Sequence, residues 1–403
     1  MTRVLLAPDK FKGTLTAAQV STHVANGLRS VLPDLEVVVV PVADGGDGTL
    51  AAAVGGGFSR VALTATGPTG EPVETAYAIR GLEAVVELAE VSGLAQLPGL
   101  RPAPLTATSR GTGELIAAAL DAGARRVVVG IGGSACTDGG AGLLEALGAR
   151  ILTATGDPVA PGGAGLAHAA RLELSALHRG LADADIVVAC DVDNALTGPT
   201  GAAVVYGPQK GASVEDVAVL DSALAHFADL VADATGAERR DDPGAGAAGG
   251  VGFGLVSVAG ATMRPGAELV FELIGLADAM ADIDLVITGE GSLDEQTLSG
   301  KAPAAVADLA RRRGIRTVAV AGRVLLTREQ LRSAGIVSSY SLLDVTSSAQ
   351  EAMRNPGPPL QEIGARIAVD LLGGGATTGA VRPAADDDAD PARVPPTQED
   401  GPA

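Results

Sequence analysis

Both ends of the chain carry the same alternation of an apolar strand, an amphipathic helix and a second apolar strand. Near the start, strands are expected at residues 4–7 and 36–41, with a helix at 16–31 between them. Near the end the pattern returns, with strands expected at 283–288, 316–321 and 335–340 and a helix at 302–313. Strand–helix–strand units of this kind are parallel and right-handed. Five strands of one parallel sheet can therefore be assembled from segments that are far apart in the sequence.

Residues 64–280 follow a different pattern of short segments interrupted by glycine. The clearest strands in it are expected at 84–88, 126–131 and 186–189, and the clearest helices at 112–120 and 214–233. We therefore predict an α/β fold in which residues 1–63 and 281–372 form a discontinuous doubly wound domain, and residues 64–280 form a second α/β domain inserted into it.

Composition agrees with this division. A chain of 403 residues is long enough for two domains, each with its own core. Hydrophobic residues make up 47% of the chain but aromatic residues only 2%, so the core consists mainly of Ala, Val, Leu and Ile. Such side chains are typical of helices packed on a parallel sheet.

Charge and cysteine content exclude several classes of protein. A net charge of −19 disfavours nucleic acid as a partner, since binding a phosphate backbone requires a basic face. The chain enters an apolar strand at 4–7 and carries no long apolar run, so neither a signal peptide nor contact with a membrane is expected. Cys136 and Cys190 are too few for a disulfide framework, and we expect reduced thiols in a cytoplasmic protein. Residues 373–403 are rich in proline and acidic residues, and we expect a disordered tail there.

Lysine is scarce, because 25 of the 29 basic residues are arginine. The four lysines are Lys10, Lys12, Lys210 and Lys301, and each lies in a polar stretch that contains glycine. A flexible point cation in such a loop suits a phosphate or a carboxylate. The alternative is a coding bias that removed most lysines and left these four by chance.

Charged loops follow the first two expected strands. PDKFKGT places Asp9, Lys10 and Lys12 at the carboxyl edge of the sheet, where open α/β folds bind ligands. PVADGGDGT places Asp44 and Asp47 around two glycines after the second strand. Two such carboxylates could hold Mg²⁺ together with its waters and a phosphate. The alternative is a glycine-rich turn capped by aspartate.

A glycine-rich loop follows the strand at 126–131. It contains Gly132, Gly133 and Ser134, and a helix is expected from Ala141. Glycines let backbone N–H groups approach an anion, and the start of a helix adds its positive dipole end. The loop has neither the Gly-Lys-Ser/Thr of a P-loop nor the third glycine of a dinucleotide-binding fingerprint. The sequence therefore predicts a phosphate site of a different type.

Three more loops complete the set. Asp191 and Asp193 follow the strand at 186–189, as a metal or general-base pair or simply as a polar strand end. Glu290 follows the strand at 283–288, and Lys301 precedes a helix. Residues 244–254 are expected to be a further backbone-lined loop, serving as a hinge or as part of a nucleotide site.

The residue types in these loops favour one kind of chemistry. The four histidines, His23, His168, His178 and His226, lie away from all of them, which disfavours zinc catalysis and a Ser-His-Asp triad. Carboxylates, lysines and a glycine-rich backbone without a nucleophile suit phosphoryl transfer, which mainly requires positioning and charge stabilisation.

These loops, in this order, resemble those of the bacterial type I glycerate kinase family. The matching stretches are APDKFKGTLTA, PVADGGDGT, GIGGSACTDGGAG, CDVDNALTGPTGAA with YGPQKGA, GAAGGVGFG and DLVITGEGSLDEQTLSGKAP. The resemblance extends to about Leu372. It departs from the family pattern at Asp47, where the family has glutamate, and at Cys136 and Thr137. It implies a flavodoxin-like (Rossmann-like) domain interrupted by a second α/β domain, and an enzyme that phosphorylates D-glycerate with ATP and Mg²⁺, generally to 2-phosphoglycerate.

The loops then suggest roles within such an enzyme. Lys10 and Lys12 would bind the glycerate carboxylate or the transferred phosphate, and the loop of Gly132, Gly133 and Ser134 would hold phosphates. The remaining candidates are Asp191 and Asp193 for Mg²⁺, Asp191 or Asp44 for the hydroxyl proton, and Glu290 and Lys301 to complete the cleft.

Two other functions remain as alternatives. An oxidoreductase would need a dinucleotide fingerprint on its first strand–helix turn, and PDKFKGT lacks one. A sensor would bind glycerate or nucleotide without turnover. The sequence leaves open whether the chain forms a homo-oligomer and which hydroxyl is phosphorylated.

Overall fold

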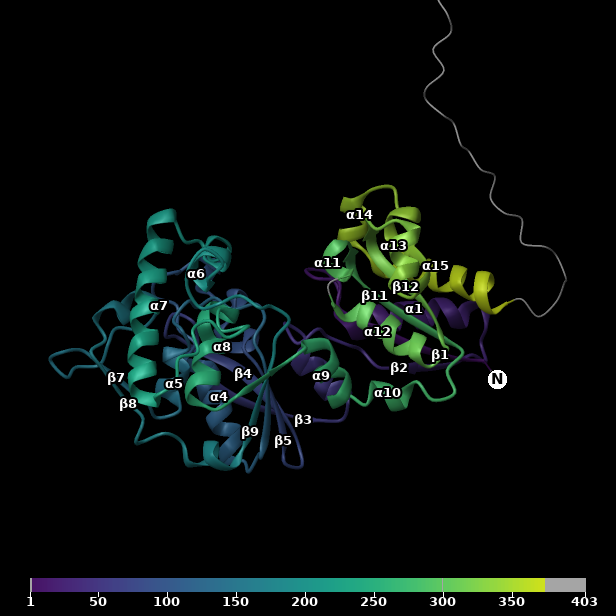
Figure 1. The fold of residues 1–403 in the computed structure, drawn as a ribbon. Helices are drawn as coiled ribbons and strands as arrows, with labels where there is room; N and C mark the ends of the chain where they lie inside the picture. Colours follow the sequence, from purple (N-terminus) through teal and green to yellow (C-terminus); the bar gives the residue numbers. More distant parts are fainter. Residues whose placement is uncertain (1, 299, 374–403) are drawn as a thin grey trace, which may run out of the picture.

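Two β-sheets form two lobes that lie side by side in the computed structural model (Figure 1). The structure describes residues 2–298 and 300–373. The predicted tail, apart from Gly373, lies outside these residues. Within the described residues, the helices are too short or too polar to cross a membrane.

The first lobe contains a sheet of five parallel strands. Its order is β13 (Ile336–Ser341), β12 (Arg316–Val324), β11 (Leu285–Leu293), β1 (Arg3–Pro8) and β2 (Glu36–Val39). Each of these strands overlaps one expected at an end of the chain. The prediction that the two ends share one parallel sheet is confirmed.

The second lobe contains a mixed sheet of six strands. Its order is β10 (Thr262–Arg264), β9 (Asp185–Ala189), β6 (Arg126–Gly130), β5 (Glu83–Glu87), β4 (Pro72–Arg80) and β3 (Ser59–Thr66). β10, β9, β6 and β5 are parallel, whereas β4 runs antiparallel to both β3 and β5. The antiparallel strands were not predicted, and the expected boundary between residues 63 and 64 falls inside β3. A two-stranded ribbon of β7 (Arg150–Leu152) and β8 (Arg171–Glu173) lies apart from this sheet.

Helices cover both sheets. Those of the first lobe and of the junction are α1 (Ala17–Val31), α2 (Thr49–Gly55), α9 (Gly266–Leu273), α10 (Leu276–Ala279), α11 (Glu295–Leu298), α12 (Ala302–Arg312), α13 (Arg328–Ser333), α14 (Ala349–Arg354) and α15 (Gly357–Ile367). Those of the second lobe are α3 (Ala89–Ser92), α4 (Arg110–Asp121), α5 (Ala141–Ala146), α6 (Ala202–Tyr206), α7 (Val214–Thr235) and α8 (Ala247–Val258).

Helix α1 shows how the sequence directs this arrangement. It begins at a capping box, in which the Thr16 hydroxyl accepts from the Gln19 amide and the Gln19 side chain accepts from the Thr16 amide. Val20, Val24 and Leu28 recur at intervals of four and are buried. Helix α15 packs on α1 so closely that a Cβ at Gly27 would lie 2.0 Å from a carbonyl oxygen of α15.

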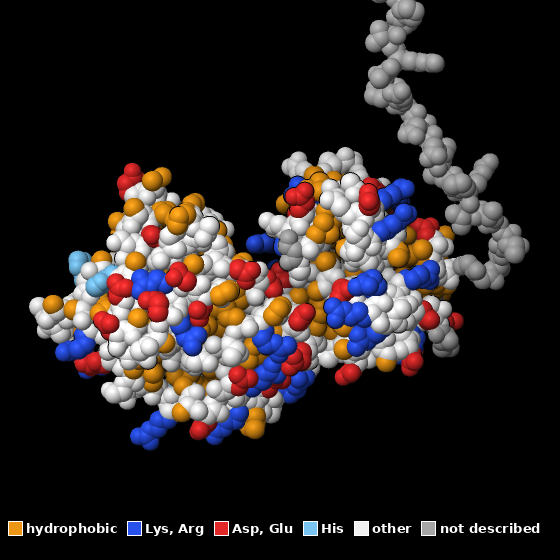
Figure 2. All heavy atoms as spheres, in the orientation of Figure 1, with side chains coloured by type: hydrophobic (Ala, Val, Ile, Leu, Met, Phe, Trp, Pro, Cys, Tyr) orange, Lys and Arg blue, Asp and Glu red, His pale blue; other side chains and the backbone are white. Residues whose placement is uncertain are grey.

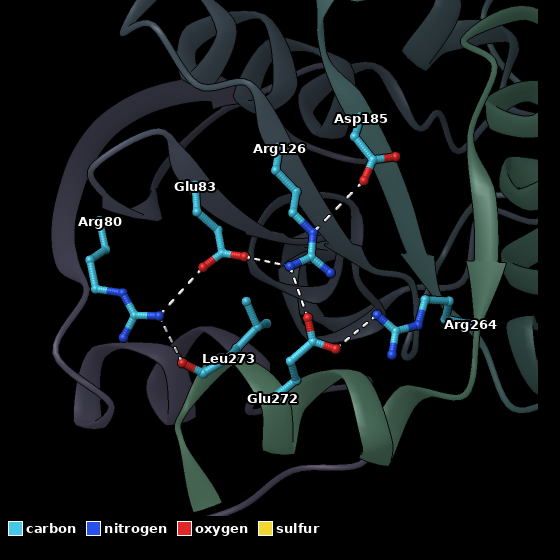
Figure 3. A network of polar contacts seen from close by, with 7 residues as sticks. All are labelled: Arg80, Glu83, Arg126, Asp185, Arg264, Glu272 and Leu273. Carbon is cyan, nitrogen blue, oxygen red and sulfur yellow. Dashed lines mark hydrogen bonds and ion pairs between the residues drawn. The ribbon is translucent and has the colours of Figure 1, made fainter. Parts of the chain in front are cut away.

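An apolar layer joins the two lobes. Leu50 of α2 and Leu269 of α9 belong to one buried cluster that also includes Val286 of the first sheet and Val128 of the second. Helix α9 is held on the second lobe by an ion-pair network at its far end (Figure 3). There Glu272 accepts from Arg126 at 3.0 Å and from Arg264 at 2.9 Å. The start of α9 is thereby fixed at the junction of the lobes (Figure 1).

Two local predictions were wrong. Residues 244–254 are not simply a loop, because α8 begins at Ala247, after which Ala248, Gly249 and Gly250 are left-handed and the chain continues as a regular helix. Strand β11 continues to Leu293, so Glu290 lies within a strand rather than after it. Pairing with the equally long β12 carries the strand through GEGSL.

Candidate active site

The carboxyl ends of the parallel strands of both sheets face a common cleft, seen in Figure 2 as a hollow between the lobes with acidic and basic side chains on its walls. Two cavities occupy it. The main cavity encloses about 680 Å³, and the small cavity about 220 Å³. Asp44, Gly46, Gly132 and Gly133 line both cavities, so the two adjoin one another.

The main cavity contains most of the predicted residues. Its lining includes the predicted Lys10, Lys12, Asp44, Gly132, Gly133, Glu290 and Lys301. It also includes Asp9, Asp47, Asp294 and Arg323. Residues about 280 positions apart in the sequence, such as Asp9 and Glu290, are therefore brought to one wall, because β1 and β11 are neighbours in the sheet.

The loop after β1 is tied to the loop after β2. The ammonium of Lys10 forms an ion pair with the Asp47 carboxylate and donates to the Asp47 carbonyl at 2.7 Å. Lys12 is exposed at the rim of the same cavity. The two lysines thus occupy different positions, one held against the neighbouring loop and one free to extend toward a ligand.

Three carboxylates of the main cavity, those of Asp9, Asp44 and Glu290, lie close enough to influence one another. Burial, followed by the charge of Asp44, raises the pKa of Asp9 to about 7, and Glu290 contributes to the same shift. Burial also raises the pKa of Glu290, against the effects of its bond from Thr297 and of the charge of Lys301. A carboxyl group that titrates near neutral pH in a cleft is suited to accepting a proton.

The glycine-rich loop after β6 approaches the loop after β2 backbone to backbone. A Cβ at Gly132 would lie 2.6 Å from the Cα of Gly46, so only glycine fits there without displacing the neighbouring chain. Gly133 has a φ of +74°. Ser134 is buried and lines the small cavity. This loop brings main-chain groups rather than charged side chains to the cleft.

Asp138 anchors the same loop from below. Its carboxylate is fully buried and accepts from the amide of Ser109 at 2.8 Å, the hydroxyl of Ser109 at 2.9 Å and the amide of Gly142 at 3.2 Å. These bonds satisfy a buried charge with donors from two segments. They fix the segment that carries Gly132 and Gly133.

The two aspartates after β9 have different surroundings. Asp191 lines the small cavity, and its carboxylate accepts from the amide of Gly266 at the start of α9, at 2.8 Å. Burial raises the pKa of Asp191, and the charges of Asp44 and Glu268 add to this effect. Asp193 instead lines a third cleft of about 860 Å³ beside α12 and α13, which Asp191 also borders.

No group of three or more His, Cys, Asp or Glu side chains in the described residues is arranged to hold a metal ion. A Mg²⁺ ion in a phosphoryl-transfer site typically uses only one or two carboxylates, and substrate phosphates and water complete its shell. Asp191 and Asp44 line the same small cavity and interact electrostatically, so their donor set fits such a site.

Several residues of the site were not assigned roles from the sequence. Asp9 stands within the predicted PDKFKGT motif, so its position gave a signal. Asp47 was predicted with Asp44 as a possible Mg²⁺ pair, and in the structure it is paired with Lys10. Arg323 gave none, because it enters the cavity only through the extension of β12. Glu87, at the end of β5, is buried and accepts from the amides of Gly48 and Leu50, at 2.9 and 2.8 Å.

Comparison with known proteins agrees with the family resemblance of the loop motifs. The model of the glycerate kinase family matches residues 4–372. A glycerate kinase of Bacillus subtilis strain 168 is 40% identical over 372 residues, covering 92% of this chain and 97% of that protein. A glycerate 2-kinase of Escherichia coli K12 is 41% identical over 356 residues, covering 87% of this chain and 93% of that protein.

A solved structure gives the same result for the fold. The crystal structure of a proposed glycerate kinase 2 from Salmonella typhimurium LT2 superposes with a TM-score of 0.81 at 40% identity, covering 93% of this chain and 99% of that one. The resemblance predicted from the loop motifs is confirmed across both lobes. The chain belongs to the glycerate kinase family.

Proposed function

We propose that this enzyme transfers the γ-phosphate of ATP to the hydroxyl at carbon 2 of D-glycerate, giving 2-phosphoglycerate and ADP. Membership of a kinase family supports glycerate phosphorylation by ATP, and the name of the E. coli relative supports position 2. The observation that carries the proposal is the main cavity. It combines Lys10, Lys12, Lys301 and Arg323 with a glycine-rich loop and with carboxylates that could accept a hydroxyl proton.

The reaction can be assigned to these groups. The oxygen of the acceptor hydroxyl forms a bond to the γ-phosphorus, the bond from that phosphorus to the β,γ-bridging oxygen breaks, and ADP leaves with the electron pair. The hydroxyl proton passes to a carboxylate of the cleft, which is Asp44 where the cavities meet or Asp191 in the small cavity, and Asp9 in the main cavity is a third candidate. Lys10, Lys12 and Lys301 offset the charge on the phosphates, while the loop of Gly132, Gly133 and Ser134 holds their oxygens.

Mg²⁺ is the proposed metal cofactor. Asp191 would hold the ion. The second carboxylate would be Asp193, which lines the third cleft together with Asp191, or Asp44, which lines the small cavity together with Asp191. Bound there, the ion would neutralise charge on the transferring phosphate. Glu290 is not proposed as a metal ligand. Its carboxylate accepts from the Thr297 hydroxyl at 2.6 Å and lies near Lys301, so we place it among the residues that contact the substrates.

Closure of the two lobes would protect the transfer from water. We propose that the five-stranded lobe is a flavodoxin-like domain, that the six-stranded lobe is the inserted domain, and that they move about the segments before β3 and after α9. Water competes with glycerate as the phosphoryl acceptor, so its exclusion prevents hydrolysis of ATP. The free thiols of Cys136 and Cys190 support a cytoplasmic location.

The test is ADP release from ATP and Mg²⁺ with D-glycerate, with L-glycerate and without an acceptor, followed by phosphorus NMR of the product. We expect release that depends on D-glycerate and a phosphomonoester coupled to the proton on carbon 2. A signal from a phosphate on carbon 3 would correct the position. An enzyme that binds glycerate but releases no ADP would be a sensor.

A further inference from the structure

Lys210 is among the most deeply buried large side chains of the molecule, with 2% of its surface exposed. It ends the short 3₁₀-helix Pro208–Lys210 in the second lobe. The residue lines the small cavity together with Tyr206 and Gln209, opposite Asp44 and Gly45 of the other lobe. Roles were proposed above for Lys10, Lys12 and Lys301, but none for Lys210.

The ammonium of Lys210 lies at the wall of this cavity. It donates to the carbonyl of Cys136, and a Cβ at Gly249 would come within 2.9 Å of it. Ala247 and Ala248, next to Gly249, line the cavity. Lys210 and the segment of Ala247 and Ala248 therefore lie together on one wall of the small cavity.

This ammonium is poorly compensated. An ammonium has three donors, and within residues 2–298 and 300–373 the Cys136 carbonyl is its one recorded acceptor. Burial lowers the pKa of Lys210, and the charge of Asp138 acts in the opposite direction. A buried cation of this kind is costly unless an anion pairs with it. An anionic ligand in the small cavity would provide the pair.

The volumes of the two cavities indicate ligands of different size. Sites for larger organic ligands usually enclose about 300–1,000 Å³. The main cavity, at about 680 Å³, is within this range and the small one, at about 220 Å³, is below it. The main cavity is also lined by apolar side chains, those of Leu342, Leu343, Ala352 and Met353. Apolar side chains for a base and cationic side chains for phosphates match a nucleotide.

We propose that the small cavity is the acceptor subsite and that the Lys210 ammonium binds the carboxylate of the hydroxy acid, while the main cavity takes the nucleotide. This inference rests on the proposed glycerate kinase activity. It assigns Lys10 and Lys12 to phosphate rather than to glycerate. The transferred phosphoryl group then crosses at Asp44, Gly46, Gly132 and Gly133, where the cavities meet.

The test compares D-glycerate with its neutral amide, glyceramide, in the wild type and in two variants. Lys210→Met keeps the length and apolar stem of the side chain and removes its charge. Lys12→Met removes a lysine from the main cavity. Since a hydrogen bond to a charged group contributes about 1.5–3 kcal/mol, we expect Lys210→Met to raise the KM for D-glycerate roughly tenfold to a hundredfold. The preference for glycerate over glyceramide should disappear, with the KM for ATP unchanged.

Lys12→Met should do the opposite, raising the KM for ATP and keeping the preference for the acid. A purely structural Lys210 would lower stability in thermal unfolding but leave that preference intact, and this result would overturn the proposal. So would loss of the preference in Lys12→Met alone. If Lys210→Met does not fold, Lys210→Gln replaces it, and binding of D-glycerate without ATP is measured by calorimetry. A wild type that forms no ADP with D-glycerate would instead overturn the proposed function.

Discussion

The two lobes build opposite walls of the same cleft from different materials. The five-stranded lobe contributes charged side chains, among them Asp9, Lys10, Glu290 and Arg323. The six-stranded lobe contributes mainly backbone, through Gly132 and its neighbours, with Asp191 and the buried Lys210 as its charges. Flexible cationic side chains can stay in contact with a phosphate as it moves. Fixed backbone amides and one buried cation instead select a ligand by its shape and by a single negative charge.

The two walls are also held differently. On the first lobe, ion pairs within the cavity position the side chains, as between Lys10 and Asp47. On the second, interactions below the surface position the loop, as between Asp138 and the segment at Ser109. Removal of a charge should therefore disturb the positions of the side chains on the first wall, and added volume should disturb the position of the loop on the second.

Lys10→Ala should give the largest effect. It removes the cation that links the loops after β1 and β2, together with a positive charge at the phosphates. We expect kcat to fall about 10²–10³-fold, as is usual when one stabilising donor is lost. Steady-state kinetics measures it. Arg366→Ala is the matched control, because Arg366 pairs with Glu362 on the surface of α15 and such pairs contribute little. A similar kcat in both variants would exclude Lys10 from the chemistry.

Asp191→Asn is the corresponding change of charge on the second wall. Asparagine keeps an oxygen that can accept from the Gly266 amide, so α9 should stay in place while the charge is lost. We expect kcat to fall about a hundredfold and the Mg²⁺ concentration needed for half-maximal rate to rise. A fall in kcat with an unchanged Mg²⁺ requirement would assign Asp191 to proton transfer alone.

Gly132→Ala adds volume to the second wall without touching a charge. Its Cβ would lie 2.6 Å from the Cα of Gly46, so the two loops must move apart. A displacement of less than 1 Å can reduce rates by about 10- to 100-fold, and we expect the lower half of that range in kcat/KM. Gly55→Ala is the control, since its Cβ would meet no atom closer than 4.0 Å. Equal activities in the two variants would mean that the close approach of the loops is not needed.

The site residues of the first lobe could be predicted from the sequence more fully than those of the second. The charged loops of the first lobe could be located because each follows a strand of a regular parallel pattern, and parallel strands bring their carboxyl ends to one edge. Lys10, Lys12 and Asp44 therefore lie where their motifs predict. Arg323 could not be located, because pairing between β11 and β12 decides how far both strands extend.

The second lobe was harder to predict. In β3, Val61, Leu63 and Ala65 alternate with exposed residues, but the strand lies at an edge of the sheet and is only half buried, so its pattern is weak. β10 has three residues, too few for a period. The burial of Lys210 depends on how α6, α8 and the loop after β6 pack together, and a loop motif carries no information about such packing.

Glu87→Gln should have the smallest effect on activity and the clearest dependence on pH, because Glu87 connects the two walls. It stands on β5 of the second lobe and holds the amides of Gly48 and Leu50, next to the loop of Asp44 and Asp47. Burial raises its pKa to about 7 against those two bonds. Glutamine keeps one acceptor and sets an NH₂ group against the other amide, so we expect kcat/KM to fall about threefold to fivefold and stability by about 1–2 kcal/mol.

The sign of the pH effect follows from that raised pKa. In the unfolded chain Glu87 titrates near 4.5, so between about pH 4.5 and 7 the folded protein holds a proton that the unfolded chain has lost. This contribution is complete below pH 4.5 and is lost as the pH rises through 7. Urea unfolding at pH 5 and pH 8 should therefore show that Glu87→Gln destabilises the protein more at pH 5. A larger loss at pH 8 would mean that Glu87 acts as a carboxylate anion that stabilises the start of α2, and that the walls are linked by charge after all.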